Sequence, residues 1–214
     1  MFDPHNDQHR VDTLDVLRTH YRNAHLGTLG KERPQLDEAT AAVAARCRFA
    51  AIGTFDIDGN ADVSPRGGPS GFIKVLSPAH LAIADLGGNN RLDTLMNVVA
   101  TGKVALLMIT PGQTETIRIN GTGHVSTNPE LLASFELPKV PKSAIVLQLD
   151  TTYMHCAKAF MRSGMWDTDV WAEMADVPDG SAVLASQGVV EDEAATRVAL
   201  DEGYKSALAH EAGE

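Results

Sequence analysis

Three groups of basic residues stand beside glycines or amides in a chain that is otherwise acidic. The chain has 214 residues and a formal net charge of −10, with 18 Lys and Arg against 28 Asp and Glu. The groups are centred on Arg66, on Arg91, and on Lys158 with Arg162. An acidic protein that binds a phosphate needs a local positive site made of Arg, Lys and backbone N–H groups. The three groups therefore indicate parts of one anion-binding site.

The first group is the stretch Ser64-Pro65-Arg66-Gly67-Gly68. A strand that ends in this way exposes backbone and presents a cation beside residues without bulk. Such an edge suits a flat or phosphorylated ligand. The alternative is a surface β-bulge in which Arg66 pairs with one of the many acids.

The second group follows a short apolar run, 80–84, that predicts a buried strand. Two glycines then indicate a tight turn, and Asn89 or Asn90 takes the expected N-cap of a helix. Arg91 in the first turn opposes the helix dipole, which is consistent with a bound anion such as phosphate. The alternative is an ordinary capped helix with a solvated arginine. The apolar residues at helical spacing are Leu92, Leu95, Met96 and Val99.

The third group lies in the stretch 153–166. Lys158 and Arg162 are spaced to share one helical face, and Trp166 follows one turn later. Trp166 and Trp171 are interpreted as core or dimer-interface anchors in preference to ring-stacking partners.

The sequence lacks the motifs that are typical of other kinds of site. The chain has no GxSxG elbow, no GxxxxGK[ST] loop and no GxGxxG turn after a first strand, and no catalytic acid–base pair is identified. Cys47 and Cys156 form no CxxC pair, so both are expected to be reduced and packed. The eight histidines, among them His5 and His9, form no HExxH pattern, and no metal is expected.

The charge balance also limits the partners. An acidic chain lacks the basic face that nucleic acids and anionic membranes require, so neither is expected to bind. No apolar run approaches the roughly 20 residues of a bilayer span, and the N-terminal residues do not resemble a signal peptide. We therefore expect a cytoplasmic protein.

Periodic segments predict the elements that position these residues. Helical spacing covers 12–21 and 36–45, and from Arg48 short apolar runs alternate with turn signals, as in antiparallel sheets. Three regions follow: an N-terminal helical arm (1–32), a barrel domain (33–171), and a C-terminal helical extension with a disordered acidic end (172–214). The expected strands are 49–55, 61–64, 72–76, 80–84, 103–109, 115–125 and 143–149, with a hairpin turn at 56–60 and a short helix at 128–135.

Taken together, three ordered motifs resemble the pyridoxamine 5′-phosphate oxidase-related FMN-binding proteins, and more closely the bacterial PPOX-class FMN-dependent flavoproteins. The motifs are Ser64-Pro65-Arg66-Gly67, the stretch from Asp85 to Thr94, and the stretch from Cys156 to Trp166. The resemblance covers residues 33–171, which is most of the chain.

This resemblance implies an α+β fold built on an antiparallel six-stranded split β-barrel with flanking helices, working as a homodimer with FMN at the interface. Thr116 matches a position that is commonly Gln and touches the flavin ring, while Lys158 and Arg162 would come from the partner subunit. At Asn90 and Arg91 the family has a Ser-Arg-Lys type phosphate-binding sequence, and this chain keeps one cation there. Its acidic C-terminal tail also has no match for the basic substrate-binding residues of the family. The implied FMN-binding residues are Ser64, Arg66, Gly67, Asn89, Asn90, Arg91, Thr116, Lys158 and Arg162.

The implied activity is that of an FMN-dependent oxidoreductase acting on a small organic substrate, with NAD(P)H or another reductant as a partner. The flavin ring itself carries the redox chemistry, so the absence of an acid–base pair is consistent with it. One alternative is a flavin-binding protein without turnover, such as a carrier or a redox sensor. Another is a barrel that binds haem or a deazaflavin, and only His155 beside Cys156 points to haem.

Overall fold

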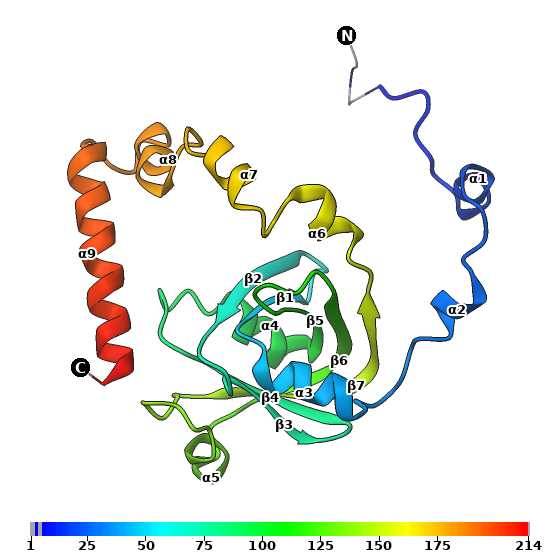
Figure 1. Ribbon diagram of the computed structural model, residues 1–214, viewed down its shortest axis with the longest axis horizontal. Coiled ribbons are helices and arrows are strands. Elements are labelled where there is room, and N and C mark those ends of the chain that lie inside the picture. The colour runs from blue at the N-terminus through cyan, green and yellow to red at the C-terminus, as the bar shows by residue number, and fades with distance from the viewer. Residues whose placement is uncertain (1–2, 4–5, 214) are drawn as a thin grey trace. The chain divides into compact units, whose positions relative to one another are not determined.

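The computed structural model describes residue 3 and residues 6–213 and has an α+β fold (Figure 1). Residues 1, 2, 4, 5 and 214 lie outside the described part, and with them His5, one of the eight histidines considered above. The chain divides into two compact units, residues 1–32 and 33–214. No helix among the described residues combines the length and the apolarity that crossing a bilayer requires.

The first unit contains two short helices with no buried residue, α1 (Leu14–His20) and α2 (Leu26–Leu29). The hydroxyl of Thr13 caps α1 by accepting a hydrogen bond from the backbone N–H of Val16 at 3.3 Å. Helix α2 occupies a segment whose two glycines predict no helix, and the His25 ring caps it through the N–H of Gly27.

The second unit is built on one antiparallel sheet of seven strands, which corrects the six strands implied by the resemblance. No pairing in the described part joins the edge strands β2 and β3, so the sheet is not closed. Pro65 lies in edge strand β2, where a residue without an N–H donor is tolerated. The strands, in the order β2-β1-β5-β6-β7-β4-β3, are β1 (Phe49–Phe55), β2 (Ala61–Gly67), β3 (Ile73–Ser77), β4 (His80–Ala84), β5 (Lys103–Ile109), β6 (Thr116–Ser126) and β7 (Ala144–His155).

Alternation along the strands separates a buried inner face from an outer face. A bulge between β6 and β7 interrupts this alternation, because Asn120 pairs with Thr151 while the next residue, Gly121, pairs with Leu149. A Cβ on Gly121 would lie 2.1 Å from the carbonyl oxygen of Gln148, so only glycine fits there. The core residues on these strands include Ala50, Ile52, Val104, Leu106, Met108, Ile117, Ile119, Ile145, Leu147 and Leu149.

Three helices of this unit are inserted before or between strands. Helix α3 (Glu38–Arg46) begins with a capping box between Asp37 and Thr40, close to the expected start. Helix α4 (Asp93–Thr101) lies against β1, β2, β5 and β6 (Figure 1). Helix α5 (Pro129–Ala133) follows Asn128, whose side chain caps it.

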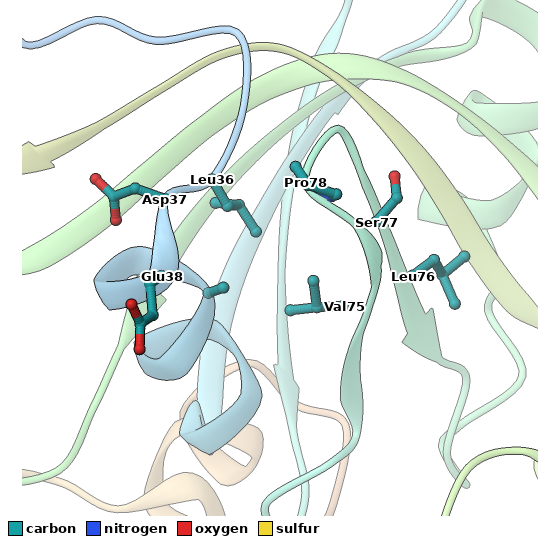
Figure 2. Close-up of a pocket in the computed structure, with 8 residues that line it drawn as sticks. Leu36, Asp37, Glu38, Val75, Leu76, Ser77 and Pro78 are labelled. Atoms are coloured by element: carbon teal, nitrogen blue, oxygen red, sulfur yellow. The ribbon is translucent and has the colours of Figure 1, made fainter.

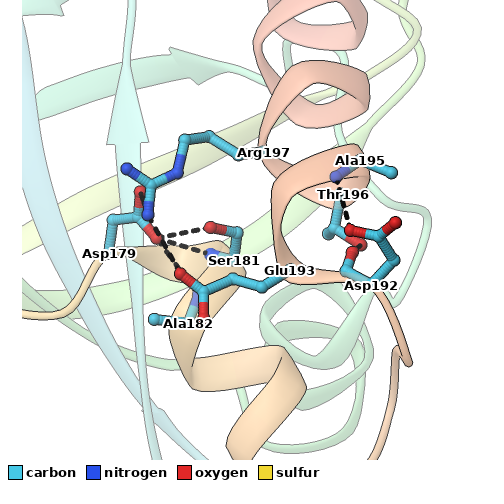
Figure 3. A network of polar contacts seen from close by, with 8 residues as sticks. All are labelled: Asp179, Ser181, Ala182, Asp192, Glu193, Ala195, Thr196 and Arg197. Carbon is cyan, nitrogen blue, oxygen red and sulfur yellow. Dashed lines mark hydrogen bonds and ion pairs between the residues drawn. The ribbon is translucent and has the colours of Figure 1, made fainter.

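The chain after β7 is helical. It forms α6 (Lys158–Ser163), α7 (Thr168–Glu173), α8 (Gly180–Ser186) and α9 (Glu193–Ala212). Helices α8 and α9 contact each other, and Figure 3 shows Asp179 accepting from Ser181 and Ala182 at the start of α8 while pairing with Arg197 of α9. Where a helix with a disordered acidic end is expected, the structure describes helix through Ala212.

Candidate functional site

The first predicted group lies along β2, on the edge of the sheet. Ser64 and Arg66 are half-buried and point to one side of the strand, while Val63, Pro65 and Gly67 are exposed on the other. Arg66 donates through Nη1 to the carbonyl of Pro65 at 2.8 Å. The predicted Ser64 and Arg66 therefore share a face, and Gly67 contributes backbone at the end of the strand.

A half-buried carboxylate at the first residue of the second motif interacts electrostatically with Arg66. Asp85 directly follows β4, and burial raises the pKa of its carboxyl group, a rise that the positive charges of Arg66 and Lys142 partly offset. Arg66 thus lies near an acid without forming an ion pair with a carboxylate in the described chain. This corrects the alternative of a bulge arginine paired to an acid.

The second predicted group forms a strained loop before α4. Asn90 and Leu92 both have left-handed backbones, with φ of +58° and +64°, a conformation that costs residues other than glycine on the order of 1 kcal/mol. Leu92 is the N-cap and makes no side-chain cap hydrogen bond. The expected N-cap at Asn89 or Asn90 is therefore wrong, because the side chain of Asn89 accepts instead from the N–H of Arg91 at 3.0 Å.

Arg91 stands just outside the helix and not in its first turn, which is a second correction. Its Nε donates to Oδ2 of Asp93 at 2.5 Å, and its side chain remains 79% exposed. The hydrogen bond to Asp93 raises the pKa of Arg91, and the charges of Asp93 and Asp62 act in the same direction. Asp93 therefore holds a permanently charged guanidinium in the solvent beside the uncapped start of α4.

Asp62 connects this loop to β2. Its Oδ2 accepts hydrogen bonds from the hydroxyls of Ser64 at 3.2 Å, Thr94 at 3.2 Å and Thr54 at 3.5 Å. Asn97 in turn donates to the Thr54 hydroxyl at 3.0 Å. The start of α4 is thus fastened to the strand that carries Ser64 and Arg66. Sequence reasoning missed Asp62, although its alternation with Ser64 and Arg66 places all three on one side of β2.

The same bonds set the rotation of α4. Thr94 and Val98 are its buried residues, whereas Met96 is 55% and Val99 is 74% exposed. The apolar spacing places Leu92, Leu95, Met96 and Val99 on one face. Leu95 packs against the core, whereas Leu92, Met96 and Val99 face outward because the bond from Thr94 to Asp62 sets the rotation of the helix.

The third predicted group has no contact with the other two in the described chain. Lys158 and Arg162 lie one turn apart on α6, as predicted, and Nε of Arg162 donates to the carbonyl of Lys158 at 3.2 Å. Trp166 lies beyond the end of this helix and donates to the carbonyl of Gln113 at 2.8 Å. Thr116 begins β6 and is 5% exposed, so in the single chain it presents little surface to a ligand.

Two hollows in the surface are lined by other residues. The larger, about 270 Å³, is bordered by the start of α3 and the β3–β4 turn, with Asp37 and Glu38 beside Val75 and Leu76 (Figure 2). The other, about 210 Å³, lies between Thr114 and the aromatic pair Phe160 and Trp166. Neither is lined by a predicted FMN-binding residue.

The geometry of β2 and the loop before α4 suits an oxyanion. The guanidinium groups of Arg66 and Arg91 are hydrogen-bond donors, and the first backbone N–H groups of α4 have no side-chain acceptor. Such a set of donors matches a phosphate, which is bound best by charge-assisted and backbone N–H hydrogen bonds.

Comparison with known proteins identifies the family. The chain matches the family model of pyridoxamine 5′-phosphate oxidase over residues 36–156. This is more than half of the chain, and the protein belongs to that family. The resemblance drawn from the three motifs is confirmed, although Lys158 and Arg162 lie beyond the matched residues. A search of curated protein sequences finds no match.

Three solved structures are similar to part of this chain. A putative pyridoxamine 5′-phosphate oxidase from Lactobacillus delbrueckii is 22% identical, with a TM-score of 0.46, covering 57% of this chain and 98% of its own. A pyridoxamine 5′-phosphate oxidase-related, FMN-binding protein from Nostoc punctiforme is 13% identical, with a TM-score of 0.38, covering 54% and 82%. HupZ from Group A Streptococcus is 12% identical, with a TM-score of 0.43, covering 56% and 93%.

Proposed function

We propose that this protein binds FMN and is an FMN-dependent oxidoreductase that acts on a small organic substrate. The observation that carries the proposal is the uncapped start of α4, which follows Arg91 and is joined through Asp62 to the strand of Ser64 and Arg66, in a chain of the pyridoxamine 5′-phosphate oxidase family. The donors and the family point to the same ligand, a flavin with a phosphate tail.

In this proposal the phosphate of FMN lies at the start of α4. Arg91, held by Asp93, and the free N–H groups of the first turn would bind it, with Arg66 donating from β2. Ser64 would line the site, since its hydroxyl already donates to Asp62. Asn89 and Asn90 shape the loop, and Gly67 lets the ligand approach the backbone. The bound flavin supplies the redox chemistry. The residues of the chain bind it, orient it and keep water from its inner side.

The remaining predicted contacts belong to the same proposal. Lys158 and Arg162 would reach the flavin from a partner subunit, and Thr116 would lie near the ring. A homodimer is supported by the apolar outer face at the sheet edge, where Val63 of β2 is 72% exposed and Phe55 of β1 is 49% exposed. A second copy of the chain would cover these side chains. Sedimentation at several concentrations measures this association.

Titration of the purified protein with FMN tests the proposal. We expect saturable binding, with a change in the visible spectrum, and about tenfold weaker binding for Arg91→Ala, since a hydrogen bond from an arginine to a phosphate contributes roughly 1.5–3 kcal/mol. Arg46→Ala is the matched control, because Arg46 is an exposed arginine in the last turn of α3. A protein that is colourless again once the unbound FMN has been removed by gel filtration would overturn the proposal.

Anaerobic titration with NADPH separates the enzyme from a flavin binder. Reduction of the bound flavin, followed by reoxidation by a small organic acceptor, is the expected result. Bound FMN that no nicotinamide reduces and no acceptor reoxidises would indicate a flavin carrier or redox sensor. A haem spectrum, or preference for a deazaflavin over FMN, would identify the remaining alternative.

A further inference from the structure

Arg118 is an exposed cation at the centre of a polar cluster on the outer face of β6 and β7. Its Nη1 donates to the hydroxyl of Tyr153 at 3.2 Å, and its Nε donates to Oδ1 of Asn120 at 3.3 Å. No carboxylate in the described part of the chain forms an ion pair with it. In a protein of net charge −10, a cation held only by neutral partners retains its charge for another ligand.

The guanidinium group is held in place from two sides. Asn120, which accepts from Arg118, donates through Nδ2 to the hydroxyl of Thr151 at 3.3 Å. The guanidinium carbon lies 5.8 Å from the centre of the Tyr153 ring, within the range of a cation–π contact. Two of the five N–H groups of Arg118 are used in these bonds, and three remain for a ligand.

The bulge between β6 and β7 creates this cluster. Before the bulge, Ile145, Leu147 and Leu149 point into the core, whereas after it the odd-numbered residues point outward. Tyr153 thereby lies directly opposite Arg118, and Thr151 lies opposite Asn120. A strand with unbroken alternation would have turned these side chains to the other face.

His155 completes the polar side of the cluster. Its ring centre is 4.8 Å from that of Tyr153, at an angle of 53°. Burial lowers the pKa of His155, and the charge of Arg118 lowers it further, so the ring is neutral at pH 7. A neutral imidazole can donate one hydrogen bond without competing with Arg118 for an anion.

An apolar row borders the cluster on the opposite side. In the register of the sheet, Arg118 lies across from Leu107 of β5, which in turn lies across from Ala51 of β1. Ala105 lies across from Asn120 in the adjacent row. These are small or half-buried apolar side chains on the same outer face, so the surface changes from apolar to cationic between β5 and β6.

We propose that Arg118, Tyr153 and His155 form a binding site for a small aromatic carboxylate. The carboxylate would accept hydrogen bonds from the free N–H groups of Arg118 and from the Tyr153 hydroxyl, and the ring would lie over Leu107 and Ala51. Guanidinium matches a carboxylate in shape, and the apolar row gives the ring a surface to cover. None of the three residues is among the proposed FMN contacts, so the site stands independently of FMN.

Calorimetric titration with benzoate tests the site, with benzamide as its neutral isostere. Both are titrated into FMN-free protein and into protein incubated with FMN. A failure of FMN to bind is thereby distinguished from a failure of benzoate to bind. We expect one benzoate per chain in the FMN-free protein, and benzamide about tenfold weaker or more. Arg118→Gln should weaken benzoate about tenfold, and Tyr153→Phe, which keeps the ring, by a smaller factor. Arg46→Gln removes the same charge from α3 and should leave binding unchanged.

Other results would overturn the proposal. Absence of saturable benzoate binding, equal binding of benzamide, or full binding by Arg118→Gln would each do so. A further outcome is that Arg118→Gln dissociates a dimer, which would assign Arg118 to a carboxylate of a second copy. Because Arg118 is exposed, we expect the variant to fold, and Arg118→Lys, which keeps the charge but loses the planar fork, should bind benzoate with intermediate affinity.

Discussion

Helices α4 and α9 begin in opposite ways. Helix α9 follows Asp192, whose carboxylate accepts from the N–H of Ala195 at 2.9 Å, and its first turn carries Glu193 paired with Arg197 (Figure 3). Helix α4 also has an acid in its first turn, Asp93, but it follows Leu92, a left-handed residue without a side-chain cap. The chain itself supplies an acceptor for the N–H groups at the start of α9. The N–H groups at the start of α4 have no side-chain acceptor, and a ligand can supply one. Unmet local preferences of this kind concentrate at functional sites.

The largest effect is expected from Asp62, which fastens α4 although it is not part of the helix. Asp62→Ala removes the acceptor of three hydroxyl groups and should lower the free energy of unfolding by about 2 kcal/mol. It should also weaken FMN binding. Urea denaturation measures the first effect, and Asp58→Ala in the exposed hairpin turn is the control. Equal stability of the two variants would mean that the hydroxyl contacts do not hold the helix.

A smaller effect is expected at the satisfied helix start. Asp192→Ala should cost about 1 kcal/mol, the usual contribution of an N-cap side chain. Faster hydrogen exchange of the Ala195 amide would locate the loss at the start of α9. The affinity for FMN should not change. If Asp192→Ala also weakened FMN binding, the start of α4 would not be the helix start that matters for the ligand.

The strain in the loop predicts a change in the other direction. Leu92→Asn should raise the free energy of unfolding by about 0.5 kcal/mol, because asparagine adopts the left-handed conformation at a lower cost than leucine. Leu92→Ala removes a similar amount of apolar surface without this relief. The two variants should therefore differ in thermal denaturation. Identical midpoints would show that the backbone at Leu92 stores no strain.

The smallest effect concerns pH and the contact of α8 with α9. The hydrogen bond from Ser181 lowers the pKa of Asp179 below its ordinary value of 3.8, assisted by the N–H of Ala182 and the charge of Arg197. A lowered pKa in the folded state means that the stabilisation is present above pH 4 or so and is lost as the pH falls through the folded pKa. The protection of the Ser181 and Ala182 amides against exchange, corrected for the intrinsic pH dependence of exchange, should fall in acid. Asp179→Asn, which cannot ionise, should show protection that does not change over this pH range.

Much of the sheet was predictable because its signals are local. The Asp58-Gly59 turn predicts the hairpin of β1 and β2, and Gly59 has the expected left-handed backbone, with φ of +85°. The clustering of Ser64 and Arg66 on one side of β2 follows from simple alternation. These features depend only on neighbours in the chain, so the sequence contains what is needed to find them.

The features that were not predicted depend on distant partners. The spacing of Leu92, Leu95, Met96 and Val99 is typical of a packed face, but of these four only Leu95 packs against the core. The bond between Thr94 and Asp62 joins residues 32 positions apart and decides the rotation of α4. The outer cluster of Arg118 and Tyr153 was missed because a bulge shifts the alternation of β7. The buried Thr152 was the available signal, since a polar residue interrupts the apolar pattern there.

The bulge beside Gly121 also affects how β7 tolerates insertions and deletions. Residues before Asp150 contribute to the hydrophobic core, and those after it line a polar surface, within a single strand. Asp150 is the extra residue of the bulge, because Leu149 and Thr151 pair with neighbouring residues of β6. Deleting Asp150 would let Thr151 follow Leu149 in regular alternation and would keep Tyr153 opposite Arg118. The bulge therefore gives β7 one residue that it can lose while the core residues before it and the outward side chains of Thr151, Tyr153 and His155 keep their faces.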